Sequence, residues 1–157
     1  MKPAYRIGLD VGSTTIKLVT LDTTGAPVLT RYERHNARIQ EKLLEVLTDL
    51  KTAVGSTPVV LHITGSVGMG IAERCGLPFV QEVVAATQYI RNIETPVSTL
   101  IDIGGEDAKV VFFDKGEATD LRMNGNCAGG TGAFIDQMAI LLGVSVEQLG
   151  ELAMQAT

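Results

Sequence analysis

Two segments of this sequence carry side chains that could do chemistry at matching positions. The first is DVGSTTIKLVTLD, from Asp10 to Asp22, and the second is DIGGEDAKVVFFD, from Asp102 to Asp114. Aligned without a gap, the two segments share an aspartate, a glycine, a lysine, a valine and a final aspartate. A chain of this length that repeats such a segment is expected to use both copies for one purpose.

A hairpin turn of the form Asp-x-Gly-Ser/Gly is suited to binding phosphate. Small residues at the tip let backbone N–H groups approach an anion, and glycine supplies the φ values that such a turn needs. In the first copy Gly12, Ser13, Thr14 and Thr15 would donate to phosphate oxygen atoms. Asp10 could hold hydrated Mg²⁺, which prefers a few carboxylates and its own water molecules.

The second copy offers the opposite half of such a site. Asp102 could orient the attacking water, while Gly104, Gly105 and Glu106 would face the phosphates from the other side. The alternative is that both copies are ordinary tight hairpins. Two copies in register, each opening a group of three strands, favour the phosphate interpretation.

Lys17 and Lys109 occupy the shared lysine position, in the strand that follows each turn. Each could reach a phosphate, and alternation along a strand equally allows each to face solvent.

Composition excludes several classes of function. The 157 residues suffice for about one average domain, and 45% of them are hydrophobic. A net charge of −5 argues against a nucleic-acid partner, which calls for clustered Lys and Arg. No apolar run reaches the ~18 residues of a membrane span, and the N-terminus lacks a signal-peptide core. The sequence predicts a cytoplasmic protein that does not bind membranes.

Periodicity predicts an α/β protein whose opening arrangement occurs twice. Each half begins with three short strands that suit an antiparallel meander, and the first half continues with a helix, a buried parallel strand and two more helices. The second half continues with a glycine-rich loop and two helices, of which the last starts with a capping-box pattern. Pro96 is the predicted boundary. The predicted strands are residues 5–10, 14–22, 28–35, 59–64, 98–105, 107–114 and 117–123; the predicted helices are 39–54, a short one ending near 74, 83–93, one ending at 142 and one starting at 145.

Cys127 lies in the loop NGNCAGGTGAF, directly before a predicted helix. The helix dipole favours a thiolate there, and the glycines leave the sulfur accessible. Cys127 could be a reactive thiol, a metal ligand or a small residue in a phosphate loop. One cysteine cannot complete an iron–sulfur cluster, which takes about four thiolates. Cys75 and His62 have no neighbouring ligand residues, so we expect a buried structural cysteine and a packed or strand-end histidine.

The DVGST and DIGGED motifs resemble the two phosphate motifs of the actin-like ATPase superfamily. This resemblance implies a ribonuclease-H-like fold in two lobes with ATP between them. With TGSVGMG and MNGNCAGGTGAF added, the sequence closely resembles the 2-hydroxyacyl-CoA dehydratase activators and the ATPase subunits of benzoyl-CoA reductases. RYERH and MNGNCAGGTGAFIDQMA are most similar to large members that combine activator and dehydratase-like regions.

The resemblance implies a homodimeric ATPase with one [4Fe–4S] cluster at its subunit interface, to which each subunit gives two cysteines. Binding and hydrolysis of ATP would drive an electron into a dehydratase partner. Cys127 matches the first of these cysteines, and the second and the adenosine motif are expected beyond Thr157. We therefore expect a complete first lobe in residues 1–96 and the truncated start of a second lobe in residues 97–157.

Two other functions remain open at this point. A kinase of the same superfamily would phosphorylate a small metabolite and would not need Cys127. A nucleotide-dependent scaffold would switch a partner interaction without any redox centre.

Overall fold

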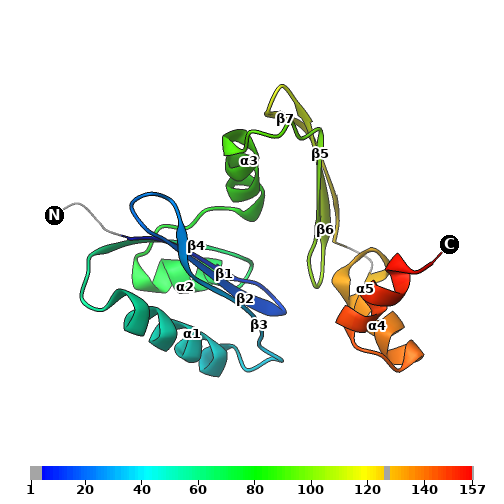
Figure 1. The fold of residues 1–157 in the computed structure, drawn as a ribbon, viewed down its shortest axis with the longest axis horizontal. Coiled ribbons are helices and arrows are strands. Elements are labelled where there is room, and N and C mark those ends of the chain that lie inside the picture. Colours follow the sequence, from blue (N-terminus) through cyan, green and yellow to red (C-terminus); the bar gives the residue numbers. More distant parts are fainter. Residues whose placement is uncertain (1–4, 126–127, 157) are drawn as a thin grey trace. The chain divides into compact units, whose positions relative to one another are not determined.

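The computed structural model describes residues 5–125 and 128–156 (Figure 1). Contacts divide the chain into two compact units, one reaching Gln88 and one starting at Tyr89. In order, the first unit contains β1 (Tyr5–Val11), β2 (Thr15–Leu21), β3 (Pro27–Arg34), α1 (Ile39–Val54), β4 (Val59–Thr64) and α2 (Gly68–Cys75). After α3 (Glu82–Asn92), which spans the boundary, the second unit contains β5 (Thr99–Ile103), β6 (Ala108–Asp114), β7 (Glu117–Asn124), a short 3-10 turn (Ala128–Gly130), α4 (Gly132–Leu142) and α5 (Val146–Met154).

The first unit is built on one mixed sheet with the strand order β3-β2-β1-β4. Short turns join β1 to β2 and β2 to β3, and both pairs are antiparallel. β4 pairs with β1 in parallel, since α1 carries the chain back to the starting end of the sheet. The predicted meander and the predicted parallel strand are both confirmed.

The core of the first unit lies between this sheet and α1. β1 buries every second side chain, at Ile7, Leu9 and Val11, because successive strand residues point to opposite faces. α1 buries Val46, Leu50 and Val54, which recur at helical spacing on one face. Figure 1 shows α1 running along the sheet of this unit.

The turn between β4 and α2 packs against the end of β1. Gly65 has φ +94°, and a Cβ atom there would lie 2.3 Å from the Val11 carbonyl oxygen and 2.4 Å from Asp10 Oδ1. The Val67 N–H donates to that same Val11 oxygen at 3.0 Å. Only glycine combines this φ with so close an approach, so Gly65 fixes how the chain passes the end of β1.

The second unit repeats the antiparallel meander, with the strand order β5-β6-β7. α4 ends at Gly143, whose left-handed φ of 67° is typical of a helix C-terminus. α5 begins at Ser145 with a capping box that Gln148 completes, as the sequence predicts. Within the described residues, no helix has both the length and the hydropathy to span a bilayer.

One expectation is wrong: Cys75 is exposed. It is the last residue of α2, a helix of eight residues whose buried positions are Gly68 and Ala72. Cys75 directly precedes Gly76, where the chain leaves the helix with φ 63°. His62 is also exposed, on β4.

Gly65→Ala tests whether this turn holds the first unit together. The new Cβ must displace the backbone of β1 and adopt an unfavourable φ, so we expect a loss of at least about 3 kcal/mol of unfolding free energy. Gly8→Ala in β1 is the matched control, because no atom lies within 4 Å of its added Cβ; it should change stability by less than about 1 kcal/mol. Urea denaturation measures both, and equal effects would contradict the assigned role of Gly65.

Candidate functional site

The two repeated segments form the same hairpin in the two units. Asp10 lies opposite Lys17 in the β1–β2 pair, and Asp102 lies opposite Lys109 in the β5–β6 pair. Each turn is closed by a matching hydrogen bond. The Gly12 N–H donates to Thr15 O at 3.0 Å, and the Gly104 N–H donates to Asp107 O at 2.8 Å. The sequence repeat is therefore also a repeat of backbone geometry.

Gly12 shows no steric need for glycine within the fold. Its φ lies outside the left-handed region, so the expected use of glycine for its φ is wrong at this position. An added Cβ would lie 3.5 Å from Thr15 O, which is ordinary contact. A ligand that approaches the backbone closely would give a reason for glycine here. Ser13 and Thr14, which follow at the tip, are half-buried, while Thr15 is buried.

The second turn is joined directly to the start of α4. Gly104 also lacks a left-handed φ, but a Cβ there would lie 2.6 Å from Asp107 Oδ1. The Gly132 N–H donates to Gly104 O at 2.8 Å, and the Ala133 N–H donates to Gly105 O at 3.3 Å. The first N–H groups of α4, which lack partners within the helix, are therefore satisfied by the turn.

The two carboxylate oxygens of Asp10 have different surroundings. Its Oδ2 accepts from Lys17 Nζ at 2.9 Å, whereas its Oδ1 is buried with no hydrogen-bond partner among the described residues. Thr64, opposite Asp10 in the β1–β4 pair, also buries an Oγ1 without a partner in this part of the chain. Buried polar atoms are normally satisfied, so two such oxygens on neighbouring strands fit a hydrated Mg²⁺ ion or its water molecules.

The two repeated lysines have different surroundings. The side chain of Lys17 is 43% exposed, and its Nζ lies 5.6 Å from the centre of the Tyr32 ring. The side chain of Lys109 is 7% exposed and forms an ion pair with Asp107 Oδ2 at 2.7 Å. The solvent-facing alternative is therefore wrong for Lys109, which supports its own turn.

The remaining predicted site residues are divided among the described and undescribed parts of the chain. Asp102 and Gly105 are half-buried, and Glu106 is exposed at the tip of the second turn. Cys127 lies outside the described residues, between the end of β7 and Ala128. No group of three or more His, Cys, Asp or Glu side chains in the described part of the chain could hold a metal ion.

Sequence reasoning missed His35 and Thr64 as neighbours of the first turn. His35 is 3% exposed, and its Nε2 lies 3.3 Å from the Gly12 carbonyl oxygen. A histidine at the end of a strand carries no signal that distinguishes this contact from ordinary packing, because its partner lies 23 residues away.

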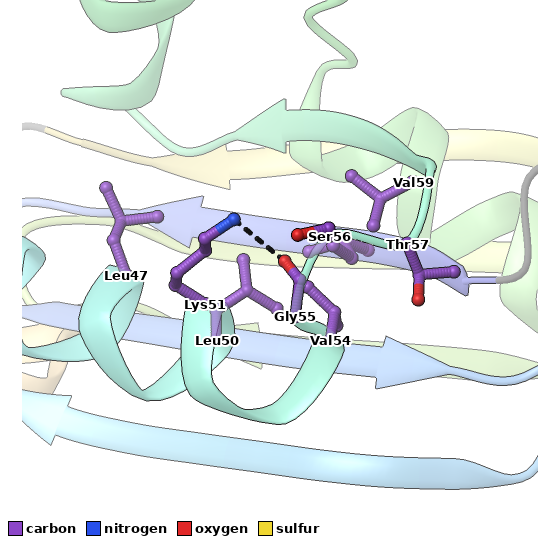
Figure 2. A pocket seen from close by; sticks show the side chains of 9 residues that line it. Leu47, Leu50, Lys51, Val54, Gly55, Ser56, Thr57 and Val59 are labelled. Atoms are coloured by element: carbon purple, nitrogen blue, oxygen red, sulfur yellow. Dashed lines mark hydrogen bonds between the residues drawn. The ribbon is translucent and has the colours of Figure 1, made fainter.

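The first unit also has a surface hollow of about 330 Å³ (Figure 2). Within it, Lys51 Nζ donates to Gly55 O at 2.8 Å. Val59 starts β4, whereas the first turn follows the other end of β1, and ligands of open α/β sheets bind near the carboxyl ends of strands. The hollow is therefore separate from the candidate site. Its lining residues are Ile7, Leu47, Leu50, Lys51, Val54, Gly55, Ser56, Thr57 and Val59.

Comparison with known proteins agrees with this geometry. Residues 7–157 match the BadF/BadG/BcrA/BcrD ATPase family. The chain belongs to this family. It is 31% identical over 156 residues to the (R)-2-hydroxyglutaryl-CoA dehydratase activating ATPase of Acidaminococcus fermentans, covering 98% of this chain and 59% of that relative. It is 31% identical over 160 residues to the 2-hydroxyisocaproyl-CoA dehydratase activator of Clostridioides difficile, covering 97% of this chain and 58% of that relative.

Solved structures support the same conclusion. The activator of the 2-hydroxyisocaproyl-CoA dehydratase from Clostridium difficile, solved with bound ADPNP, matches with a TM-score of 0.79 at 30% identity, covering 98% of this chain and 57% of that one. The ethanolamine utilization protein EutJ from Carboxydothermus hydrogenoformans matches with a TM-score of 0.63 at 19% identity, covering 94% of this chain and 60% of that one, and supports the fold alone. The predicted actin-like α/β fold is confirmed, and membership of an ATPase family implies nucleotide binding. The chain spans a little under three-fifths of the activators named above.

Asp10→Asn tests whether the carboxylate of Asp10 lowers the unfolding free energy of the first unit. The pair with Lys17 is partly exposed and contributes about 0–1 kcal/mol. Asparagine leaves a polar amide atom at the place of the buried Oδ1, but a neutral amide costs less to bury than a carboxylate. We therefore expect the unfolding free energy to stay within about 1 kcal/mol or to rise. The control is Asp49→Asn, which breaks a similar pair with Arg31 at a carboxylate that has no buried unpaired oxygen; it should be slightly destabilising. A loss above about 2 kcal/mol for Asp10→Asn would rule out a stability cost at this site.

Proposed function

We propose that this chain is the nucleotide-binding part of an ATP-driven [4Fe–4S] electron-transfer activator of a 2-hydroxyacyl-CoA dehydratase. The observation that carries the proposal is the repeated hairpin. Both copies have the same Asp–Lys register and the same closing hydrogen bond, in a member of an ATPase family, and its relatives include a 2-hydroxyacyl-CoA dehydratase activating ATPase. The acyl-CoA substrate is left unspecified.

The proposed roles follow from the geometry of each turn. Asp10 would hold Mg²⁺ through water, which is supported by its buried, unpaired Oδ1. Lys17 is already within hydrogen-bond distance of Asp10 and could move to a phosphate when the metal neutralises that carboxylate. Asp102 would orient the attacking water. The groups contacting phosphate would come from Gly12, Ser13, Thr14 and Thr15 on one side and from Gly104, Gly105 and Glu106 on the other.

The contact between the second turn and α4 supports a link from nucleotide to cysteine. α4 follows Cys127 after four residues in the sequence, and its first two N–H groups bond the carbonyl oxygens of Gly104 and Gly105. A phosphate that moved the tip of this turn would therefore move the start of α4. This arrangement gives ATP binding a short route to the segment that carries the thiol.

Cys127 is the residue proposed to bind the cluster. When bound, a [4Fe–4S] cluster supplies one-electron transfer, and it takes about four thiolates. One chain therefore cannot complete it with Cys127 alone, and we propose that a second copy in a homodimer and a further cysteine of each copy supply the rest. Because such a site needs ATP and reduced thiols, we propose that the protein is cytoplasmic. The proposed partner that receives the electron is a dehydratase.

Cys127→Ser tests the electron-transfer function, with Cys75→Ser as the matched control. The whole protein that contains this chain, purified without oxygen, should contain iron and show thiolate-to-iron absorbance. Cys127→Ser should remove most of both, because serine is a poor ligand for this cluster. Cys75 is exposed at the end of α2 in the first unit, so Cys75→Ser should keep the iron.

Two outcomes would reject this function. An iron-free wild-type protein with normal ATP turnover would exclude electron transfer. Transfer of phosphate to a small metabolite that survives Cys127→Ala would instead identify a kinase.

A further inference from the structure

His35 makes two hydrogen bonds to the first turn, and its ring makes a third one to the residues that follow it. Its backbone N–H donates to Thr14 O at 3.2 Å, and its Nε2 lies 3.3 Å from Gly12 O. Its other ring nitrogen, Nδ1, accepts from the Ala37 N–H at 3.2 Å. A ring nitrogen that accepts a hydrogen bond carries no proton, so the proton of the neutral ring must lie on Nε2. His35 therefore donates to the Gly12 carbonyl oxygen.

This contact has a counterpart in the second turn. Gly104 corresponds to Gly12, and its carbonyl oxygen accepts from the Gly132 N–H at 2.8 Å. In both units the donor comes from the segment that follows the third strand of the meander: His35 follows β3, and Gly132 follows β7 and the 3-10 turn. The corresponding carbonyl oxygen therefore accepts a hydrogen bond in both turns. The donor is a side chain in the first turn and the N–H group of a helix start in the second.

The backbone after His35 is unusual. Asn36 has φ 47° and Ala37 has φ 63°, which is a left-handed conformation that residues with a Cβ atom rarely adopt. This conformation accompanies the Ala37 N–H bond to Nδ1, which fixes the tautomer of the ring. Strain of this kind is typical of functional sites.

A held carbonyl group also fixes its neighbouring amide. The peptide between Gly12 and Ser13 is planar and trans, so its C=O and N–H point in opposite directions. When the ring of His35 holds Gly12 O, the Ser13 N–H must point to the other side of that peptide plane. Since the Gly12 N–H is bonded to Thr15 O, the Ser13 N–H is the next backbone donor at the tip.

We infer that His35 is a positioning residue, whose Nε2–H holds the Gly12–Ser13 peptide in the orientation that presents the Ser13 N–H to a phosphate group. The inference rests on the proposed function of the first turn as a phosphate site. Nothing in the position of His35 requires that it touch the nucleotide itself.

Three substitutions separate the two ring nitrogens. His35→Gln keeps a donor near the position of Nε2, His35→Asn keeps polar atoms only near the position of Nδ1, and His35→Leu keeps neither. Calorimetry with Mg·ADPNP should show roughly tenfold weaker binding for His35→Leu and His35→Asn, and binding within about threefold of wild type for His35→Gln. Val46→Ala, on the buried face of α1, is the stability control, and it should lower the melting temperature without weakening binding.

Three results would overturn the role of His35. One is equal weakening by His35→Gln and His35→Leu, and another is equal weakening by Val46→Ala. The third is a ring ¹⁵N spectrum that shows the proton on Nδ1.

If the wild-type protein does not bind Mg·ADPNP, the proposed function is rejected. The contact of His35 with the turn can then still be tested by amide exchange. Amide exchange at Ser13 should then be faster in His35→Leu than in His35→Gln. Equal exchange in the two variants would reject the positioning role.

Discussion

The candidate site depends on one constraint, the closed turn of the β1–β2 hairpin and its counterpart in the β5–β6 hairpin. One backbone hydrogen bond, from Gly12 to Thr15 or from Gly104 to Asp107, sets the length of the turn and hence the register of the strands behind it. That register places Asp10 opposite Lys17 and Asp102 opposite Lys109. A turn one residue longer or shorter would place the aspartate and the lysine of that hairpin on opposite faces of the sheet.

The two turns are supported in different ways. This difference agrees with their proposed roles, which are metal binding at the first turn and the link to Cys127 at the second. The first is held by the His35 side chain and lies beside two buried oxygens that lack partners, on Asp10 and Thr64. Such unpaired oxygens cost stability, and in the proposed function they would be satisfied by a metal ion and its water molecules. The second turn is held by the first N–H groups of α4 and by the ion pair of the buried Lys109 with the half-buried Asp107, so this turn and the start of α4 are bonded directly.

The sequence predicts what is local in this fold. Apolar alternation and helical spacing predict the strands and helices, and the equal register of the hairpins follows from the repeat. Contacts between distant residues could not be predicted: His35 with Gly12, Thr64 beside Asp10, and α4 with the second turn all depend on how the sheets are completed. The burial expected for Cys75 was wrong because Cys75 is the last residue of α2 and, unlike Gly68 and Ala72, does not lie on the buried face of this helix. Glycine at position 12 was predicted both for its φ and for the close approach of an anion; its φ lies outside the left-handed region, so only the second of these reasons can apply.

An amide NMR titration with Mg·ADPNP tests most directly the proposal that both turns bind one nucleotide. The signals of Ser13 and Thr14 in the first turn and of Gly105 and Glu106 in the second should shift together and yield one dissociation constant. Gly150, in α5 with no atom within 4 Å of an added Cβ, gives a reference signal that should not move. Shifts confined to one turn, or two different dissociation constants, would contradict the claim that the repeated hairpins form a single phosphate site.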